Sequence, residues 1–483
     1  MKALLLAVLI FTPNPGAAQE VPVPEPNWGT PVPPTERKPF ALPAVREDAL
    51  ANGIKLSLLE LKDLPIVTVV IQIRRIVESI QGEAKMITAL LQEGTLFQDV
   101  TAFDRARKKL GAFIKFEANS DDIAVSVTAK KDSIRQAVAL AAEAIFWPKL
   151  AEEDLERNRV NALAGIKQNA SSPEAMAAKQ LNKRIFGDHP YGHSLTEQDI
   201  NSLDRAKLLN FHAKNFVPSA MGISIAGDIG LEEAKSLAGE NFGSRITPEF
   251  AKTAQGIASS IPDAPAAAAA ESPPEIDLID RPGMKQSVLM LGLHVIPRNH
   301  PDYYPLRVMN AVFGGGMGSR IYQNLRERNQ WTYGASSAFQ PALKEGALVV
   351  QTKVKTENAA DAVREILFEM NRLRDEEVPE PELAKIKNAM EGNTANGLAF
   401  VQALAGALSF LDLHGIPKAE LPKIGERILA VTSADVQRVA RIYLQPNKAA
   451  IVVAGDAVKI RAALEKIASV RLITPDGNPV PGA

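Results

Sequence analysis

The 483-residue sequence contains no cysteine. The chain therefore has no disulfide framework, no thiol nucleophile and no thiol that could accept a lipid. A GxSxG pattern, which would place a serine nucleophile on a sharp turn, is also missing. The sequence thus offers neither a cysteine nucleophile nor a serine nucleophile of that type.

The chain also lacks an excess of charge of either sign. Its formal net charge is −1, from 55 basic and 56 acidic residues, and no long basic block occurs. Neither nucleic acid nor an anionic membrane surface is therefore expected as the main partner. No segment beyond the N-terminus is long and apolar enough to cross a bilayer, so we expect no membrane span.

A short apolar run, from Ala3 to Phe11, follows one lysine at the N-terminus. Small residues come next, at positions 16–18, which is the pattern of a cleavable secretory signal peptide. We expect residues 1–18 to be removed and the proline-rich residues 19–43 to form an extended leader. These features predict a periplasmic or secreted protein.

Three blocks of the sequence recur at nearly one offset. At 483 residues and 46% hydrophobic content, the chain is too long for one compact core. The recurrences therefore indicate duplicated halves. The pairs are AVSVTAKK from Ala124 with LVVQTKVK from Leu348 (348 − 124 = 224), VALAAEAI from Val138 with VREILFEM from Val363 (363 − 138 = 225), and EEDLERNRVNAL from Glu152 with EPELAKIKNAME from Glu380 (380 − 152 = 228).

The halves are separated by a stretch rich in Ala, Pro and Ser, residues 246–275, which is typical of a linker. We place the first domain at 44–245, the second at 276–470 and a loose tail at 471–483. Each half shows alternating strands followed by long amphipathic helices. This order predicts an α+β fold with two homologous domains, each a mainly antiparallel sheet covered by helices.

Four stretches carry a resemblance to a known family. They are GEAKMITALLQEGT (Gly82 to Thr95), FGDHPYGHSL (Phe186 to Leu195), FHAKNFVPSAMGISIAGD (Phe211 to Asp228) and GGGMGSRIYQNLRERNQWTYGASS (Gly314 to Ser337). Together they resemble the pitrilysin or insulinase superfamily of zinc metallopeptidases, above all its bacterial two-subunit branch and the mitochondrial processing-peptidase subunits. The resemblance covers roughly residues 44–470. It implies that this chain forms one half of a clamshell-shaped peptidase.

The first stretch is similar to the family's HxxEH helix. Two His four apart on one helical face hold zinc, and the Glu between them takes a proton from the metal-bound water. Here those places hold Lys85, Thr88 and Ala89: a cation, a weak hydroxyl ligand and a methyl group. The family's third ligand, a Glu, would fall at Ala164 or Gly165. The resemblance therefore implies that this chain binds no zinc and no other cofactor.

A substitute metal site is not evident in the sequence. His189 and His193 are four apart, but Pro190 and Gly192 interrupt the helix that would align their rings. Such pairs on a turn usually reflect loop composition, so we disfavour a metal role. The other histidines have no partner spacing: His212, His294, His300 and His414.

A glycine-rich loop follows a helical pattern near the middle of the second half. A phosphate-binding loop would need GxxxxGK and Ser or Thr after a strand, whereas here Ser319 and Arg320 follow the glycines. The residues alone favour a flexible turn between helices. The resemblance instead implies the substrate-contacting loop of the non-catalytic processing-peptidase subunit. The glycines are Gly314, Gly315, Gly316 and Gly318.

Arg326 precedes Tyr333 by seven residues, similar to an Arg and a Tyr that reach the bound peptide in the family. A guanidinium and a phenol can donate hydrogen bonds to a substrate carbonyl and to the oxyanion formed from it. Alternatively, Arg326 and Arg328 lie on a solvated helix face and Tyr333 covers the core. QWTY stands where the family has GLAY, so Trp331 is a departure from the family pattern next to the tyrosine.

The resemblance implies a division of labour. This chain would be the non-zinc subunit of a heterodimeric peptidase that acts on unfolded peptides, with Arg326 and Tyr333 serving in trans. The partner, a homologous HxxEH-bearing subunit, would supply zinc and base. The alternative is a structural or binding scaffold, resembling the core subunits of respiratory complexes. A self-sufficient peptidase would require a metal site that the sequence does not offer.

Overall fold

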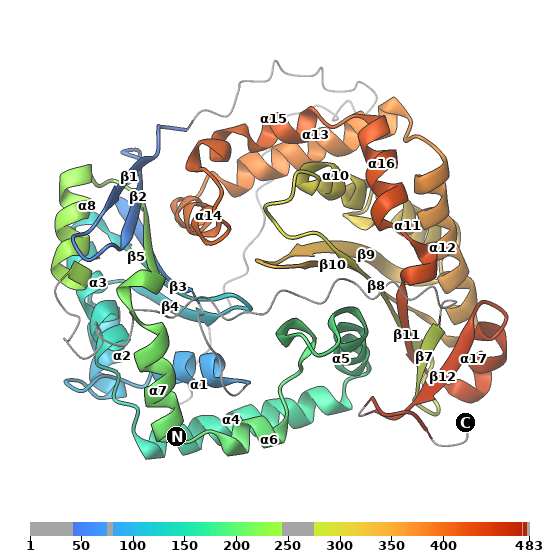
Figure 1. Ribbon diagram of the computed structural model, residues 1–483, viewed down its shortest axis with the longest axis horizontal. Coiled ribbons are helices and arrows are strands. Elements are labelled where there is room, and N and C mark those ends of the chain that lie inside the picture. The colour runs from blue at the N-terminus through green and yellow to red at the C-terminus, as the bar shows by residue number, and fades with distance from the viewer. Residues whose placement is uncertain (1–41, 75–80, 244–274, 476, 481–483) are drawn as a thin grey trace, which may run out of the picture. The chain divides into compact units, whose positions relative to one another are not determined.

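The computed structural model describes residues 42–74, 81–243, 275–475 and 477–480 (Figure 1). The predicted signal peptide, almost all of the predicted leader and almost all of the predicted linker lie outside the described residues. The described residues, from Leu42 onward, form one packed unit.

The first half contains a six-stranded sheet in the order β1-β2-β6-β3-β5-β4. Of these neighbours, β2 and β6 run parallel and the other pairs are antiparallel. The central strand β3 reads IVTVVIQIR and is almost wholly buried, as expected of a strand covered on both faces. The strands are β1 (Arg46–Ala49), β2 (Lys55–Glu60), β3 (Ile66–Arg74), β4 (Phe113–Ala118), β5 (Asp122–Lys130) and β6 (Met221–Gly227).

Helices cover this sheet and form the main core of the first half with it. The helix α3 packs on β3 and β5 through a row of apolar residues. The first-half helices and turns are α1 (Glu83–Leu90), α2 (Val100–Lys109), α3 (Lys131–Phe146), α4 (Glu152–Ser171), α5 (Pro173–Phe186), η1 (Pro190–Gly192), α6 (Glu197–Ser202), α7 (Arg205–Asn215), η2 (Pro218–Ala220), α8 (Leu231–Ala238) and η3 (Gly239–Gly243).

The second half builds a second six-stranded sheet, in the order β12-β7-β11-β8-β10-β9. Its strands from β11 to β9 are antiparallel, while β12, β7 and β11 are parallel neighbours. The strands are β7 (Glu275–Asp280), β8 (Gln286–Val295), β9 (Thr332–Pro341), β10 (Gly346–Lys355), β11 (Ala450–Gly455) and β12 (Ser469–Ile473).

The helices of the second half follow the same plan as those of the first. The helix α12 packs on β8 and β10, as α3 does on β3 and β5. They are α10 (Tyr303–Gly314), α11 (Arg320–Tyr322), η4 (Gln323–Arg328), η5 (Thr356–Asn358), α12 (Ala359–Asp375), α13 (Glu380–Gly397), α14 (Val401–Leu413), η6 (Lys418–Lys423), α15 (Ile424–Leu429), α16 (Ser433–Tyr443), η7 (Pro446–Lys448) and α17 (Ala457–Leu464).

The duplication predicted from the sequence is confirmed element by element. The helix α4 begins at Glu152 and α13 at Glu380, an offset of 380 − 152 = 228. The helices α5 and α14, which come next, begin at Pro173 and Val401, again 228 apart. The predicted α+β class, with two homologous halves and mainly antiparallel sheets, is correct.

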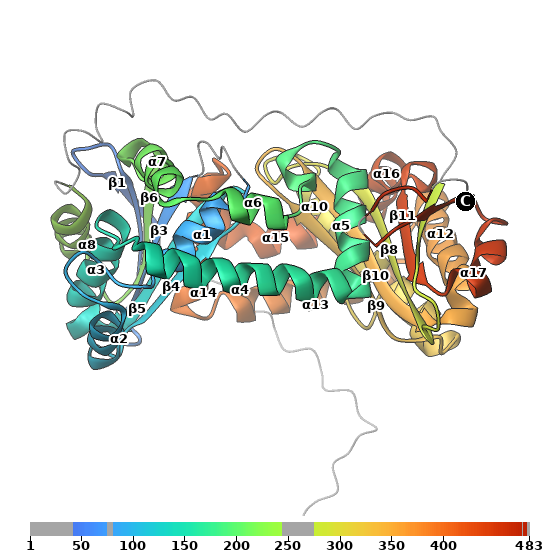
Figure 2. The ribbon, with the colours of Figure 1, turned by 90° about the horizontal axis from the view of Figure 1, so that it is seen from below.

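The equivalent helices α5 and α14 are exchanged between the halves. The helix α5 packs on β8 and β11 of the second sheet, and α14 packs on β3 and β6 of the first sheet. The 20-residue helix α4 leads into α5 (Figure 2). At the junction Ser172 caps α5 by accepting a hydrogen bond from the Ala175 amide, and Pro173 occupies its first turn. Each sheet is therefore completed by a helix from the other half.

Buried polar contacts reinforce this exchange. Asp277 on β7 is fully buried and accepts hydrogen bonds from Gln180 at 2.6 Å and Arg184 at 3.3 Å, both on α5, and from Arg471 at 2.9 Å. A fully buried carboxylate requires such partners, since an unpaired charge is costly to bury. The exchanged helix is thus held by charge as well as by apolar contact.

The second half extends beyond the boundary at residue 470 that the sequence suggested. The strand β12 continues to Ile473, which is 1% exposed, and pairs in parallel with β7. The Val480 amide also donates to the Leu472 carbonyl. Residues 471–473 therefore belong to the sheet and not to a loose tail, because Leu472 and Ile473 pack against the apolar core and Arg471 binds the buried Asp277.

Within the described residues, no single helix is both long and apolar enough to cross a bilayer. The consecutive helices α13 and α14 meet the length and composition requirement together, but they are bent by 107° where they join.

Candidate functional site

The helix α1 presents the positions that correspond to the HxxEH ligands. It begins after Gly82, whose φ of 94° suits glycine. Lys85 is exposed and Ala89 is half-buried, while Thr88 is buried. The Thr88 hydroxyl donates a 2.6 Å hydrogen bond to the Ala84 carbonyl, one turn earlier. The hydroxyl is therefore directed to its own helix.

The position expected for the third ligand lies on α4, a helix that contacts α1. Ala164 is exposed and Gly165 is half-buried, and neither side chain can coordinate a metal. In the part of the chain that the structure describes, no three His, Cys, Asp or Glu residues are grouped so that they could hold a metal ion. The residues present at this site therefore do not fit the zinc of the resembling peptidases.

His189 and His193 flank the one-turn helix η1 and have separate roles. Nδ1 of the buried His189 accepts a 3.2 Å hydrogen bond from the Tyr191 amide. Nε2 of the exposed His193 lies 3.0 Å from Oδ2 of Asp199. The two rings are thus engaged in different contacts, in agreement with the expectation that Pro190 prevents a shared helical face.

A pocket of about 480 Å³ opens beside the first degenerate metal position. Lys85 lines it together with the turn between β4 and β5 and the segment around η1. Tyr191 in its wall donates a hydrogen bond to Asp121, and burial raises the pKa of this tyrosine. The pocket therefore brings Lys85 close to two segments that are distant in the sequence, the turn at 118–120 and the segment 190–195.

The glycine-rich loop joins α10 to α11, and its glycines differ in their surroundings. A Cβ on Gly314 would lie 2.4 Å from the Ser337 Oγ, and one on Gly315 would lie 2.6 Å from the Ala311 Cα. At Gly316 a Cβ would meet nothing within 4 Å, and at Gly318 only an ordinary contact at 3.8 Å. The first two glycines are thus required for packing, whereas the last two lie on the open part of the loop.

The loop is anchored at its end by a contact that the sequence reading missed. Arg320 is 7% exposed and donates to Glu382 on α13 through Nε at 2.9 Å and Nη2 at 3.1 Å. Such a bidentate pair fixes the guanidinium plane. The recurring charged block at the start of α13 was visible in the sequence, but nothing in it indicated a partner at Arg320.

Arg326 and Tyr333 lie next to each other. The Arg326 Cζ is 5.2 Å from the centroid of the Tyr333 ring, and its Nη1 donates a 3.2 Å hydrogen bond to the Thr332 carbonyl. A guanidinium at this distance is attracted by the ring. The structure therefore forms a local pair from two residues that the sequence singled out.

Tyr333 is 85% exposed, which contradicts the alternative in which it covers the core. Thr332 is buried, whereas Tyr333 and Gly334 are both exposed, at a point where the pairing of β9 with β10 shifts its register. Trp331, the departure from the family pattern, packs partly buried against the core, and its amide donates to the Leu325 carbonyl. The tyrosine is therefore presented to solvent with Trp331 as an anchor behind it.

The segment that carries Arg326 is a π-helical turn, η4, where a charged α-helix was expected. Arg328 is exposed, as expected if both arginines lay on a solvated helix face. Arg326, in contrast, is half-buried. π-Helical turns are rare and occur often at functional sites. This wider turn is part of the geometry that sets Arg326 beside Tyr333.

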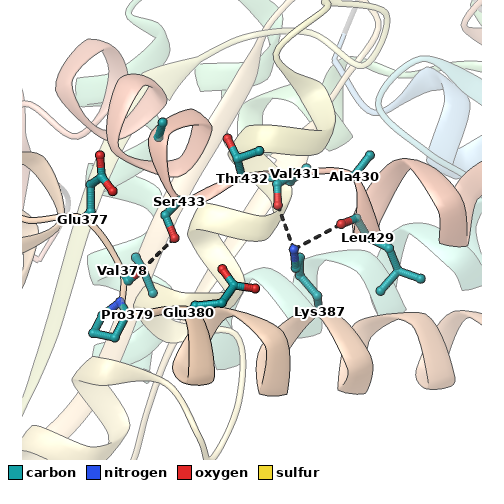
Figure 3. Close-up of a pocket in the computed structure, with 11 residues that line it drawn as sticks. Glu377, Val378, Pro379, Glu380, Lys387, Leu429, Ala430, Val431, Thr432 and Ser433 are labelled. Carbon is teal, nitrogen blue, oxygen red and sulfur yellow. Dashed lines mark hydrogen bonds between the residues drawn. The ribbon is translucent and has the colours of Figure 1, made fainter.

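A further pocket, of about 640 Å³, lies at the start of α13 and α16 (Figure 3). Figure 3 shows the Lys387 ammonium between two carbonyl oxygens, to which it donates: Leu429 at 3.1 Å and Val431 at 2.9 Å. The Ser433 hydroxyl donates to the Val378 carbonyl at 2.7 Å. These groups tie loop carbonyls in place and lie apart from the residues indicated by the sequence.

Comparison with family models identifies the class to which the chain belongs. Residues 77–199 match the model of the insulinase family, peptidase family M16, and residues 202–390 match the model of the peptidase M16 inactive domain. The chain belongs to the pitrilysin/insulinase (M16) superfamily. The "inactive domain" model lies on the later segment and does not cover α1.

Individual relatives agree with this class. The chain is 24% identical over 378 residues to an uncharacterized zinc protease of Mycobacterium bovis, covering 77% of this chain and 84% of the relative. It is 21% identical to the uncharacterized zinc protease YmxG of Bacillus subtilis, over 65% of this chain and 74% of the relative.

Solved structures share the fold. A peptidase M16 inactive domain from Pseudomonas fluorescens gives a TM-score of 0.76 at 24% identity, covering 85% of this chain and 98% of that chain. A protease from Helicobacter pylori gives 0.77 at 19% identity, covering 86% and 100%. Complex III2 from Candida albicans contains a chain with a TM-score of 0.71 at 16% identity, covering 88% of this chain and 100% of that chain.

Proposed function

We propose that this chain is the non-zinc subunit of a heterodimeric, periplasmic or secreted metallopeptidase that acts on unfolded peptides. A homologous HxxEH-bearing partner supplies zinc and the general base, and this chain contributes Arg326 and Tyr333 to the peptide in trans. The proposal is supported by membership in a peptidase superfamily together with degenerate metal positions at Lys85, Thr88 and Ala89.

The single observation that carries the proposal is the pairing of Arg326 with the exposed Tyr333. Tyr333 is 85% exposed, and its phenol has no hydrogen-bond partner among the described residues. Arg326 uses one guanidinium N–H to bind the Thr332 carbonyl and keeps others available. Large exposed aromatic residues paired with arginine are typical of binding surfaces, whereas a tyrosine with only a packing role is usually buried.

The chemistry of the pair suits peptide hydrolysis powered from another chain. The guanidinium and the phenol both donate hydrogen bonds, and both can stabilise the negative charge that develops on a carbonyl oxygen when water attacks it. Neither group needs to gain or lose a proton for this role. Loss of one such donor is expected to lower turnover by about 10²-fold.

The test is a reconstituted complex with an HxxEH-bearing partner that co-purifies from the native source. Tyr333→Phe and Arg326→Met are compared with the control variants Tyr322→Phe and Arg328→Met. We expect loss of peptide cleavage in the first pair, unchanged cleavage in the controls, and intact assembly of all four by size-exclusion chromatography.

Unchanged cleavage by the Arg326 and Tyr333 variants, with assembly intact, would instead establish the scaffold role. Zinc near one equivalent in the isolated chain, with activity lost to a chelator, would overturn the division of labour altogether.

A further inference from the structure

The described residues that line the pocket beside α1 include several polar side chains and the ammonium of Lys85. Its polar lining comprises Lys85, Gln81, Asn119, Asn182, Tyr191 and His193, with the Ser120 hydroxyl beside them. Among the described residues that line it there is no Asp or Glu. Of these groups, the carboxamides of Gln81 and Asn182 can donate hydrogen bonds to an anion, and the ammonium of Lys85 adds a full positive charge.

Two acidic groups beside this lining are hydrogen-bonded to residues other than Lys85. Asp121 accepts from Tyr191 and, at 3.0 Å, from the Leu343 amide. Asp199 accepts from Thr196 and lies 3.0 Å from the His193 ring. Both carboxylates are therefore held by donors other than Lys85, and neither forms an ion pair with it.

A third carboxylate, Asp122, is also hydrogen-bonded to residues other than Lys85. It accepts at 2.9 Å from Asn119 and at 2.9 Å from the buried Gln72. These three carboxylates thus have hydrogen-bond partners other than Lys85, and the ammonium of Lys85 remains exposed at the pocket.

Lys85 itself has no carboxylate partner anywhere in residues 42–74, 81–243, 275–475 or 477–480. The side-chain amides of Gln81 and Asn182 likewise bind no other described residue. An ammonium and two unengaged amides at one pocket form an arrangement that a carboxylate can satisfy through charge-assisted hydrogen bonds. The pocket volume of about 480 Å³ lies in the usual range for ligand sites.

We propose that this pocket binds a carboxylate group of the peptide. The inference rests on the proposed function, in that it assumes peptides reach this face of the chain. At the position where resembling peptidases place the first metal-binding histidine, this chain carries an ammonium, so the local preference changes from a cation to an anion. The carboxylate belongs either to an acidic side chain or to a peptide C-terminus.

The test measures peptide binding by the isolated full-length chain, so that it needs neither a partner nor catalysis. Four fluorescent, unstructured peptides of one composition are compared by anisotropy. They carry either a central Glu or a central Gln, and either a free or an amidated C-terminus. We expect about fivefold tighter binding of whichever carboxylate the pocket takes, and a smaller difference at high salt.

Substitutions at Lys85 test whether this preference arises at the pocket. Because Lys85 is exposed, Lys85→Met should fold normally and should remove the preference without weakening the Gln, amidated peptide. Lys85→Glu should reverse the preference. The matched control is Lys466→Met, at an exposed lysine of the second half, and it should leave all four affinities unchanged.

Equal binding of all four peptides, a preference that survives Lys85→Met, or no binding of any peptide would each overturn this assignment. None of these results decides the role of Arg326 and Tyr333, since that role is measured by cleavage in the reconstituted complex. A failure of the Arg326 and Tyr333 variants to affect cleavage would in turn leave the binding result at Lys85 intact.

Discussion

The Arg326 guanidinium carbon lies 5.2 Å from the centre of the Tyr333 ring, while Nη1 of the same residue donates to the Thr332 carbonyl. The backbone contact limits the guanidinium to one side of the ring. Trp331, packed against the core, fixes the start of the strand that carries Tyr333. Two donors are therefore held beside each other on an exposed face before any ligand arrives, which lowers the entropic cost of binding.

This geometry predicts that lysine cannot replace Arg326. A lysine keeps the charge but lacks the planar fork that can bind the Thr332 carbonyl and a ligand together. In the reconstituted peptidase we expect Arg326→Lys to lower kcat at least tenfold, a loss of about 1.4 kcal/mol in transition-state stabilisation. Steady-state kinetics would show this, with Arg328→Lys as the control. A kcat equal to that of the wild type would mean that charge alone suffices.

Glycines within one loop should differ sharply in their tolerance of alanine. A Cβ at position 314 would come within 2.4 Å of the Ser337 Oγ and 2.6 Å of the Ile321 Cδ1, so Gly314→Ala overpacks the loop. We expect a loss of about 1–3 kcal/mol in unfolding free energy. Gly316→Ala has open space and should change stability by less than about 0.5 kcal/mol. Urea unfolding measures both, and equal effects would contradict the packing role of Gly314.

Much of the fold could be predicted from the sequence because the two halves repeat. The offset of 228 between Glu152 and Glu380 correctly indicated two equivalent helices. The exchange of α5 and α14 could not be predicted, because periodicity shows that a helix has an apolar face but not which sheet covers it. The partner of that face is a property of the tertiary structure.

Prediction of the site was limited in the same way. The family resemblance pointed to Arg326 and Tyr333, but it did not show that η4 is a π-helical turn or that Tyr333 is exposed. The pocket at Lys85 could not be foreseen, since Asn119 and Asn182 are distant in the sequence and ordinary in type. Local patterns indicate residue chemistry, whereas convergence of distant side chains depends on the whole fold.

Zinc binding should require new ligands on α1 and α4. In the wild-type chain a helix with Lys85 and Ala89 offers no lone pairs to a cation, so we expect less than about 0.1 equivalent of zinc after dialysis. Lys85→His and Ala89→His place two imidazoles on one face, and Ala164→Glu adds a carboxylate. The triple variant should retain about one equivalent by elemental analysis.

A parallel variant with Gly165→Glu in place of Ala164→Glu tests the register of the third position. Only the substitution that faces α1 should strengthen zinc binding over that of the two-histidine variant. Tight zinc binding by the unmodified chain would contradict the account of this site.

The exchanged helix α14 should stabilise the first sheet, although it belongs to the second half. Leu408 is fully buried in a cluster that includes Val70 of β3 and Ala226 of β6. Leu408→Ala removes this contact and should cost about 2–5 kcal/mol. Hydrogen exchange by mass spectrometry should show faster exchange in β3 and β6. A second substitution in the same cluster, Leu404→Ala, should have the same effect. Faster exchange confined to the second sheet would refute the coupling.

Stability should fall between about pH 6.5 and pH 4 because of a buried histidine. Burial lowers the pKa of His212 to about 4, although Nε2 donates a 2.7 Å hydrogen bond to the Ile145 carbonyl. In the unfolded chain a histidine has its ordinary pKa near 6.5. The unfolded state therefore binds the proton first as the pH falls, and the stabilisation present above pH 6.5 is lost progressively down to pH 4.

A shift of this size corresponds to at most about 3 kcal/mol. His212→Gln should lower stability at pH 7.5 but give a flatter loss between pH 6.5 and pH 4, as measured by urea midpoints. Some slope should remain, since burial and the charge of Arg298 also lower the pKa of His414 to about 4. The exposed His193→Gln is the control. A slope unchanged in His212→Gln would show that the acid sensitivity arises at other groups.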